Sequence, residues 1–431
     1  MPIPHLASTP ALDLEKRILA AKPAIEHWLR KQWKHHTVPF YCSVDLRNSG
    51  FKLAPVDTNL FPGGFNNLNP DFAPLCIQAM MIAVEKICPD AHSVLLIPEN
   101  HTRNVFYLQN VAALQSIMQQ AGMNVRIGSL LPEITQPTTI PLPDGQSLLL
   151  EPLQRNGNKL VVENFDPCAI LLNNDLSGSI PDMLRNLDQT IIPPLHAGWA
   201  TRRKSWHFSA YDNVAQDFAE LIGIDPWLID PYFTSCGKVD FQEKEGLDCV
   251  AAAVDEILSQ IKEKYTQFGI KEKPFVIVKA DSGTYGMGIM SIRDGAEIYK
   301  LNRKQRNKMT TIKEGTVVKN VLVQEGVHTL ESIHQAVAEP VIYMIDHLVV
   351  GGFYRVHMSR GVDENLNAPG MHFVPLPFDA TCMQTNPEAR PDAVPNRFYI
   401  YGVIARLALL AAAIELERYT QASSLALAEA Q

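Results

Sequence analysis

The chain has 431 residues and a formal net charge of −8, which favours two or three domains and disfavours a nucleic-acid partner. Hydrophobic residues make up 46% and charged residues 19%, as in ordinary globular proteins. No basic-then-apolar leader opens the sequence, and Arg406 interrupts the longest apolar stretch, 398–414, so neither secretion nor a membrane partner is expected. We expect a cytoplasmic protein that binds anions through locally gathered cations or metal ions.

The cysteines are scattered along the chain, and no two of them form a CxxC pair. Their number is seven, and this odd, dispersed pattern fits neither a zinc site nor a disulfide framework. We expect reduced thiols that pack like small apolar side chains. They are Cys42, Cys76, Cys88, Cys168, Cys236, Cys249 and Cys382.

In the first half of the chain, helical and strand patterns alternate, which favours a parallel sheet with helices on its faces. The predicted helices cover residues 11–35, 70–87, 104–121 and 181–187. The predicted strands cover 38–46, 52–60, 93–98, 123–128 and 168–173, with short β pieces in the proline-rich segment 129–165.

A break at Pro193-Pro194 separates this half from a second group of elements. Its predicted helices cover 211–221, 247–268 and 399–417, and its predicted strands cover 317–324 and 341–357, with a turn at Gly351-Gly352. The basic segment 198–204 and the proline-rich 376–395 are predicted loops, and the basic segment 302–314 is expected to face solvent.

Residues 274–289, PFVIVKADSGTYGMGI, place a lysine at the end of an apolar strand and a glycine-rich loop after it. Lys279 can supply a point charge to a triphosphate, while backbone N–H groups from Ser282 through Gly283, Gly286 and Gly288 close over its oxygens. The order of lysine and glycines fits neither a Walker loop nor a dinucleotide fingerprint. We interpret the hairpin as part of an ATP site; a surface lysine beside an ordinary hairpin is the alternative.

Two other segments can complete a nucleotide site. Lys204, in the basic run 202–204, can flank the same triphosphate, although such a run is also typical of a solvated surface. The strand end Gln324-Glu325-Gly326-Val327 can offer backbone groups to an adenine edge and a carboxylate to a ribose, although similar strand ends are common elsewhere.

Polar side chains on three further predicted strands suit the transfer of a phosphoryl group. Arg355 can clamp a carboxylate or an acyl-phosphate oxygen, although the segment after it is equally compatible with a plain turn. Asp57 and Asn59 are two residues apart on one strand and so share a face, and Asp45 lies on the preceding strand. These hard oxygen ligands suit Mg²⁺; a polar hairpin with an Asx turn is the alternative.

With these pieces together, the chain resembles the ATP-grasp carboxylate–amine ligases, and within them it is similar to the proteobacterial glutamate–cysteine ligase family. The segments that carry the resemblance are Pro55–Leu68, His196–Phe208, Lys279–Gly288 and Arg355–Met371. The resemblance implies an α/β (α+β) ATP-grasp fold with a Rossmann-like parallel-sheet domain. By motif it assigns phosphate contacts to Lys204, Lys279 and the glycine-rich loop, and the acyl phosphate to Arg355.

The order of the motifs departs from the usual superfamily order, in which Asp…Glu-x-Asn follows the final long helix. Here the matching pattern, Asp45…Asp57-x-Asn59, stands near the N-terminus. We therefore infer a circularly permuted ATP-grasp, which requires Asp45 and Asp57 to face each other across an antiparallel pair with its turn centred near Phe51. The expected domains are 1–70, 71–197 and 198–431, with a small lobe at about 270–330.

The reaction that the resemblance implies joins the γ-carboxylate of L-glutamate to the amine of L-cysteine through a γ-glutamyl phosphate, using ATP and Mg²⁺, as the first step of glutathione biosynthesis. Arg47 and Arg103 are candidates for binding substrate carboxylates, and Asn66 and Asn67 for lining the amino-acid pocket. Two alternatives remain: another ATP-grasp ligase such as a glutathione synthetase, and a regulator that binds ATP without catalysis.

Overall fold

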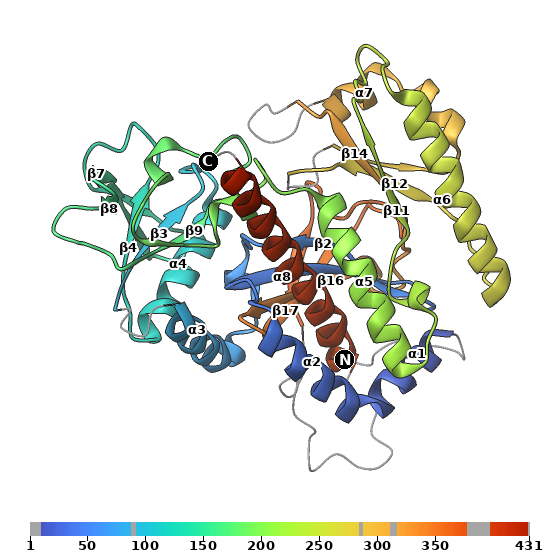
Figure 1. The fold of residues 1–431 in the computed structure, drawn as a ribbon, viewed down its shortest axis with the longest axis horizontal. Helices are drawn as coiled ribbons and strands as arrows, with labels where there is room; N and C mark the ends of the chain where they lie inside the picture. The colour runs from blue at the N-terminus through green and yellow to red at the C-terminus, as the bar shows by residue number, and fades with distance from the viewer. Residues whose placement is uncertain (1–9, 88–91, 284–287, 311–316, 377–396, 430–431) are drawn as a thin grey trace.

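A central sheet, a parallel sheet on one side and a small antiparallel lobe on the other make up the protein (Figure 1). The computed structural model describes residues 10–87, 92–283, 288–310, 317–376 and 397–429. Helices at both ends of the chain, α1 (Pro10–Ala20), α2 (Lys22–His35) and α8 (Arg397–Glu429), lie near the central sheet. The predicted helix 11–35 is therefore two helices, which meet next to Pro23, a residue that favours the start of a helix.

The central sheet combines strands from both ends of the chain. Its order is β18-β17-β16-β1-β2, with β15 beside β16, and all the pairs are antiparallel. The N-terminal hairpin thus completes a sheet whose other strands come from the C-terminal third, which is the arrangement that the permuted order predicts. The bounds are β1 Tyr41–Asn48, β2 Leu53–Asn59, β15 Ser332–Ile333, β16 Ala336–Ile345, β17 Leu348–His357 and β18 His372–Pro375.

The register of the β1–β2 hairpin confirms that Asp45 faces Asp57. Asn48 pairs with Leu53, and the turn between them is closed by a 2.9 Å hydrogen bond from Ser49 N to Lys52 O. This turn alone would leave the aspartates out of alignment. A bulge just beyond Asp45 adds one residue, Val56, on β2 and restores the pairing.

The turn between β16 and β17 lies at Asp346-His347, so the predicted turn at Gly351-Gly352 is wrong. Both glycines lie inside β17, where the backbone approaches its neighbours closely. A Cβ atom built on Gly352 would lie 2.5 Å from the carbonyl oxygen of Val341. These glycines therefore allow close packing of the backbone, which is a known role of glycine inside strands besides its role in turns.

The parallel sheet has the order β10-β9-β3-β4-β6-β5, and only the edge strand β5 is antiparallel. Helices α3 (Ala73–Ile87) and α4 (Val105–Gln120) accompany it, and β3 is buried along its whole length. The predicted helix at 181–187 is wrong: a 3-10 turn, Asp182–Leu184, stands there, and Leu184 is its one buried residue. The strands are β3 Ser93–Pro98, β4 Asn124–Ser129, β5 Thr138–Pro141, β6 Ser147–Pro152, β9 Ala169–Asn173 and β10 Thr190–Ile192, with a separate hairpin of β7 Gln154–Asn156 and β8 Lys159–Val161.

The small lobe is an antiparallel sheet of order β11-β14-β12-β13 covered by the long helix α6 (Leu247–Phe268). Cys236 of β11 and Cys249 of α6 form a disulfide, so the expectation of reduced thiols is wrong for this pair. Cys42, Cys76 and Cys168 are free, and the other two cysteines lie outside the described residues. The other elements of the small lobe are β11 Phe233–Gly237, β12 Val276–Ala280, β13 Ile289–Ile292, β14 Asn320–Glu325 and α7 Arg303–Thr310.

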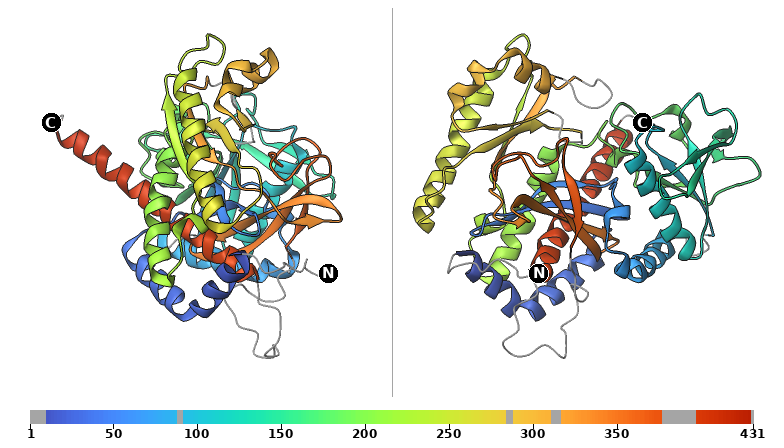
Figure 2. Two further views of the ribbon diagram at one scale, coloured as in Figure 1. Left: turned by 90° about the vertical axis from the view of Figure 1, so that its right-hand side faces the viewer. Right: turned by 180° about the vertical axis from the view of Figure 1, so that it is seen from behind.

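Helix α8 forms the apolar centre of the molecule. It packs against β1, β2 and α5 (Lys204–Ile222), and only its C-terminal end extends beyond the body of the protein (Figure 2). By length and composition its segment Phe398–Ala422 could cross a membrane, but 89% of its most apolar window is buried inside the protein. Packing in the core therefore accounts for its apolar composition.

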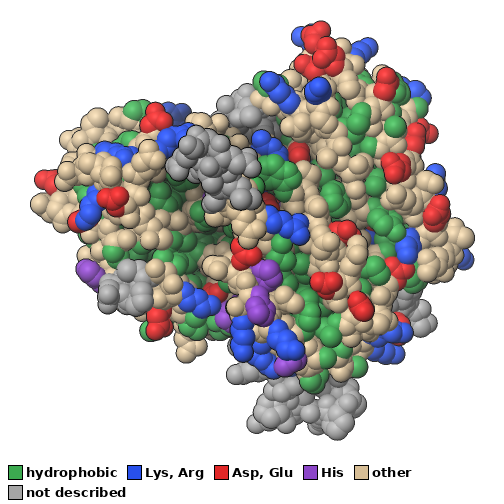
Figure 3. Space-filling view, in the orientation of Figure 1, with side chains coloured by type: hydrophobic (Ala, Val, Ile, Leu, Met, Phe, Trp, Pro, Cys, Tyr) green, Lys and Arg blue, Asp and Glu red, His purple; other side chains and the backbone are tan. Residues whose placement is uncertain are grey.

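The visible face of the protein in Figure 3 carries acidic and basic side chains interspersed with apolar and uncharged polar ones. Buried charged side chains, in contrast, connect elements of the fold. Arg202, next to the start of α5, donates to both carboxylate oxygens of Glu415 on α8, at 2.8 and 3.1 Å, and to the carbonyl oxygen of Thr58 on β2 at 2.8 Å. His207 also contacts Glu415, and these three side chains are almost completely buried. One carboxylate thus connects α8, α5 and β2.

Replacement of Glu415 by alanine should strongly destabilise the fold, because it leaves Arg202 charged and unpaired in the interior. We expect the free energy of unfolding of the central part to fall by roughly 3–5 kcal/mol, measured by urea denaturation followed by tryptophan fluorescence. Glu417→Ala is the matched control on the same helix. Glu417 is about one-third exposed and pairs with His36, so its loss should cost at most about 1 kcal/mol. Equal effects of the two variants would contradict this account.

Candidate active site

Two cavities meet at one face of the central sheet. The first, of about 750 Å³, lies between the small lobe and the central sheet, and its lining includes Lys204, Lys279 and Gln324. The second, of about 1,090 Å³, lies between the central and parallel sheets and is lined partly by Asn66 and Asn67. Four residues line both cavities, so they mark the place where ligands in the two would meet: Asp45, Asp57, Arg355 and Asn367.

Two buried lysines from different elements converge on the first cavity. Lys204 is the first residue of α5, and its Nζ donates to Oδ1 of Asp57 at 2.6 Å. Lys279 lies on β12, and its Nζ donates to the carbonyl oxygen of Val56 at 2.7 Å and to Oε1 of Gln324 at 2.8 Å. Each is 5% exposed. The structure thus brings together two lysines that the sequence separates by 75 residues (279 − 204).

Burial and neighbouring charges shift the pKa values of Asp57 and Lys279. Burial alone would raise the pKa of Asp57, but Lys204 and Lys279 outweigh it and lower that pKa to about 2. Burial lowers the pKa of Lys279 to about 7, although Asp57 acts in the opposite direction. Lys279 is therefore close to half-protonated at neutral pH, and a nearby phosphate would favour its charged form.

A row of alternating charges crosses the sheet beside the lysines. Glu339 on β16 accepts from Nε of Arg47 at 2.8 Å and from Nη1 of Arg355 at 2.6 Å. The same Nη1 of Arg355 donates to Oδ2 of Asp45 at 2.8 Å. Burial opposes the charged form of Arg355, but Asp45 and Glu339 outweigh it and raise its pKa. Arg355 is thus held as a permanent cation at the junction of the cavities.

Sequence reasoning missed Glu339, which is 3% exposed and lies against both arginines. Burial would raise its pKa, but Arg47 and Arg355 outweigh that effect and lower it. The available signal was a single carboxylate inside the otherwise apolar run 336–345, where a buried charge needs a partner.

The donor set around Asp45 and Asp57 fits Mg²⁺. Like charges directly opposite on paired strands destabilise each other, and burial raises the pKa of Asp45, to which Glu339 and Asp57 add. A divalent cation between the two carboxylates would relieve that repulsion. Asn59 instead accepts from Phe61 N at 3.0 Å in an Asx turn. Among the described residues no group of three or more His, Cys, Asp or Glu is arranged for a metal, so Mg²⁺ would need ligands from phosphate and water.

The glycine-rich hairpin borders the first cavity through Ser282 and Gly283. Gly283 and Gly288 have φ of 94° and 61°, which favour glycine, and Ala280 N donates to Gly288 O at 3.0 Å. Gly286 lies outside the described residues. These positions agree with a loop whose backbone approaches a ligand, and its phosphate contacts stay a prediction.

The side chains at the end of β14, after Val323, have different surroundings. Gln324 and Val327 line the first cavity, and Nε2 of Gln324 is buried without a hydrogen-bond partner among the described residues. Glu325 also lines this cavity, and its carboxylate accepts from Lys52 Nζ at 2.7 Å and from Trp227 Nε1 at 3.0 Å. The predicted ribose contact of this carboxylate would have to compete with these partners, and it stays a prediction.

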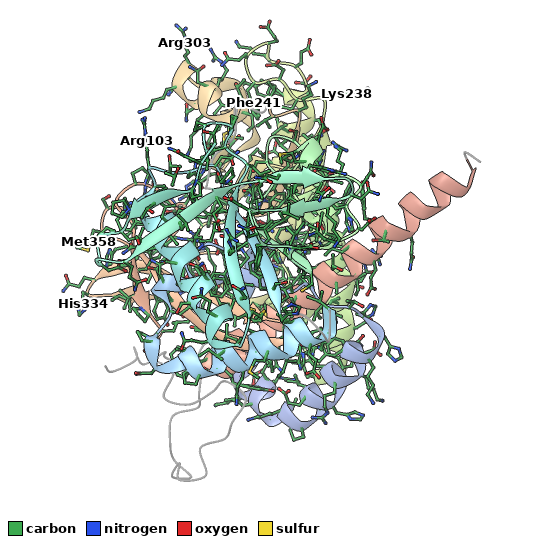
Figure 4. The ribbon with its side chains drawn as sticks, turned by 90° about the vertical axis from the view of Figure 1, so that its left-hand side faces the viewer. Arg103, Lys238, Phe241, Arg303, His334 and Met358 are labelled. Atoms are coloured by element: carbon green, nitrogen blue, oxygen red, sulfur yellow. A yellow bond between two sulfur atoms is a disulfide. The ribbon has the colours of Figure 1, made fainter. Side chains whose placement is uncertain are left out.

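The predicted amino-acid contacts are distributed unevenly. Asn66 and Asn67 line the second cavity, whereas Arg47 lines the first. Arg103 is exposed and lines neither, contrary to our expectation; in Figure 4 it lies at the surface. The chain turns here so that Glu99 and Asn104 face the cavity. Glu99 was missed, although it directly follows a buried parallel strand, a position typical of ligand sites.

Two cavities that share charged lining residues give room for a nucleotide beside a second substrate, as an ATP-dependent carboxylate–amine ligase requires. The comparisons give the family: the glutamate-cysteine ligase (GshA) family matches residues 15–416, and the chain belongs to it. It is a ligase that joins glutamate to cysteine with ATP, and its substrates are small molecules. This family assignment argues against both alternatives drawn from the sequence, a glutathione synthetase and a non-catalytic regulator.

Solved structures agree with this assignment. A protein from Methylobacillus flagellatus KT described as a "Putative gamma-glutamylcysteine synthetase" is 64% identical, with a TM-score of 0.89 over 97% of this chain and 100% of that one. A glutathione synthetase-like effector from Globodera pallida (11% identity, TM-score 0.36, 80% and 79% of the chains) and a D-alanyl-alanine synthetase A from Vibrio cholerae (10%, 0.34, 74% and 81%) are too distant to carry an argument. No curated protein matches significantly.

The lowered pKa of Lys279 predicts that ATP binding takes up protons above pH 7. The free protein holds less than one proton at Lys279 there, and an anionic triphosphate favours the protonated lysine. We expect uptake that approaches one proton at pH 8–8.5 and an affinity that falls by up to about tenfold per pH unit. Calorimetric titrations with ATP in buffers of different ionisation enthalpy measure both quantities.

Lys279→Met removes the titrating group and is expected to abolish this proton uptake. Lys300→Met, on the exposed 3-10 helix of the small lobe, is the control that should retain it. Proton uptake that persists unchanged in Lys279→Met would show that another group titrates.

Proposed function

We propose that ATP occupies the first cavity, that the two amino acids occupy the second, and that the γ-carboxylate of glutamate meets the γ-phosphate between them. The supporting observation is the shared lining of the two cavities by Asp45, Asp57 and Arg355. The parallel sheet lies wholly within residues 71–197 and supports that segment as a unit, whereas the central sheet joins strands of 1–70 to strands of 198–431.

In the first step, an oxygen of the γ-carboxylate attacks the γ-phosphorus of ATP, and ADP leaves. A carboxylate is a poor electrophile, and phosphorylation converts it into an acyl phosphate. Lys204 and Lys279 are placed to neutralise the charge that spreads over the transferring phosphoryl group. Gln324 keeps Lys279 aimed at the cavity through its 2.8 Å hydrogen bond.

In the second step, the neutral amine of cysteine attacks the carbonyl carbon of the acyl phosphate, and phosphate leaves as the amide forms. Arg355 is the cation at the junction, held by Glu339 and Asp45, and it would stabilise the tetrahedral oxyanion. Such a contact typically contributes about 3 kcal/mol to the transition state. Glu339 acts here as a positioning residue, because it orients both Arg355 and Arg47.

Asp45 and Asp57 are the residues that would hold Mg²⁺, and Asn59 could join them only by leaving its turn with Phe61. When bound, the ion would supply positive charge to the phosphate oxygens.

We also infer a cytoplasmic location, which the use of ATP supports. The Cys236–Cys249 disulfide argues against it, since disulfides are rare in a reducing compartment. Cell fractionation would decide between them.

Phosphate release from ATP tests the proposed function. We expect release that depends on glutamate and cysteine together, with γ-glutamylcysteine as the product detected by mass spectrometry. Best release with γ-glutamylcysteine and glycine would instead indicate a glutathione synthetase. No release with any pair of amino acids would leave only nucleotide binding.

Asp57→Asn should weaken the use of Mg²⁺ more than it weakens the fold. The variant keeps the size of the side chain but loses the charge that faces Asp45 and Lys204. We expect the Mg²⁺ concentration for half-maximal rate to rise by about tenfold or more, with the melting temperature within a few degrees of the parent. Asp71→Asn, at an exposed aspartate outside both cavities, is the control. An unchanged Mg²⁺ requirement in Asp57→Asn would rule out the assignment.

A further inference from the structure

The central sheet presents apolar side chains directly beside its charged ones. In an antiparallel sheet, residues opposite one another on paired strands share a face. Asp45 lies opposite Val341, and Val341 lies opposite Phe353, so this row leads from the junction of the cavities to apolar side chains. Val341 and Phe353 line the second cavity but not the first. The apolar part of the sheet therefore lies on the second-cavity side of the junction.

Three aromatic rings enlarge this apolar surface. Tyr343 is two residues from Val341 on β16 and so shares its face. The ring centroid of Phe353 lies 5.3 Å from that of Tyr343 and 4.8 Å from that of Phe373 on β18. All three rings line the second cavity, and Phe373 is only partly buried. We call Tyr343, Phe353 and Phe373 the aromatic cluster.

Contacts with the loop after β2 hold the aromatic cluster in place. The hydroxyl of Tyr343 donates to the carbonyl oxygen of Gly63. Gly64 has a φ of 111°, and a Cβ atom built on it would lie 2.8 Å from the Tyr343 hydroxyl oxygen and 3.3 Å from a ring carbon of Phe353. Glycine is suited to both the conformation and the close approach. Both glycines line the second cavity too, so the aromatic cluster is a preformed part of its wall.

The aromatic cluster suits a thiol better than a hydroxyl. Its one polar group is the hydroxyl of Tyr343, whose proton is already given to Gly63. A ligand hydroxyl that is buried against such a surface loses hydrogen bonds with water, which costs free energy. A thiol is a weak donor that packs like a small apolar group, and sulfur gains from contact with aromatic rings.

The chemistry of the substrates identifies the ligand. Glutamate brings charged groups to the site, whereas the thiol of cysteine is a neutral side chain. The amine of cysteine must reach the junction, and its thiol is three bonds away from that amine. Side chains opposite each other, such as those of Asp45 and Val341, are about 5 Å apart at Cβ, so the aromatic cluster is within reach. We propose, on the basis of the function above, that Tyr343, Phe353 and Phe373 hold the side chain of cysteine and select a thiol over a hydroxyl.

The same surroundings favour the protonated thiol. Burial raises the pKa of the Tyr343 hydroxyl, and Asp45 adds to this effect, although Arg355 acts in the opposite direction. Desolvation of this kind would also raise the pKa of a thiol that lies against Tyr343. The thiolate is the nucleophilic form of cysteine, so the amine is left as the reacting group.

Phe353→Leu and Phe373→Leu test the inference, because leucine remains apolar but lacks the aromatic ring. Phosphate release is measured at saturating glutamate and ATP, with cysteine or serine as the second amino acid. Apolar pockets discriminate such isosteres by about 100-fold, so the reaction of serine stays measurable. We expect kcat/KM for cysteine to fall by about threefold to tenfold in each variant, with that for serine within about twofold of the parent value. The KM for glutamate and for ATP should stay unchanged.

Phe165→Leu is the matched control, since Phe165 is a partly buried phenylalanine outside both cavities, and it should keep the preference for cysteine over serine. An equal fall for cysteine and serine in both cluster variants would show that the rings only support the fold and would overturn the inference. A rise in the KM for glutamate alone would overturn it too. Failure of the proposed function gives a different result, since the parent protein would then release no phosphate in response to glutamate and cysteine.

Discussion

The ion pair between Lys204 and Asp57 is the contact on which the site depends, because it joins three parts of the chain at one point. Asp57 belongs to the N-terminal hairpin, Lys204 begins the helix after the parallel-sheet domain, and Lys279 of the small lobe lowers the pKa of the same carboxylate. Buried charges are tolerated only when partners compensate them. Lys279 also donates to the carbonyl oxygen of Val56, so it connects the small lobe directly to the strand that carries Asp57.

The described lining of the first cavity has four cations, Arg47, Lys204, Lys279 and Arg355, facing the carboxylates Asp45, Asp57 and Glu339, while Glu325 is neutralised by Lys52. Without ligand, the lysines and Arg355 therefore rest on protein acceptors. A triphosphate would take over the lysines, and Asp57 would then need a new cation. Nucleotide and metal binding are expected to be coupled for this reason, since each supplies the charge that the other displaces.

Features that depend on a short stretch of sequence could be predicted. Asp45 and Asp57 as a facing pair, Lys279 before its glycines, and Arg355 on a strand all follow from local patterns. Features set by distant partners could not be. The pairing of Glu339 with Arg47 crosses 292 residues, and that of Glu325 with Lys52 crosses 273. The predicted substrate contact of Arg103 could not be judged from the sequence, because the path of the loop decides which side chain faces the cavity.

The permuted order separates the two halves of the phosphate site in sequence and brings them together in one sheet. Strand β1 lies between β2, its immediate neighbour in sequence, and β16, which is about 300 residues away, and both pairings position Asp45. Such non-local contacts form slowly because the chain must first close a long loop. Helix α8 packs against β1, β2 and α5 and is the last element of the chain, so its docking can complete this assembly. The apolar composition of α8 is thus linked to the site, because the helix shares one hydrophobic core with the N-terminal hairpin that carries Asp45 and Asp57.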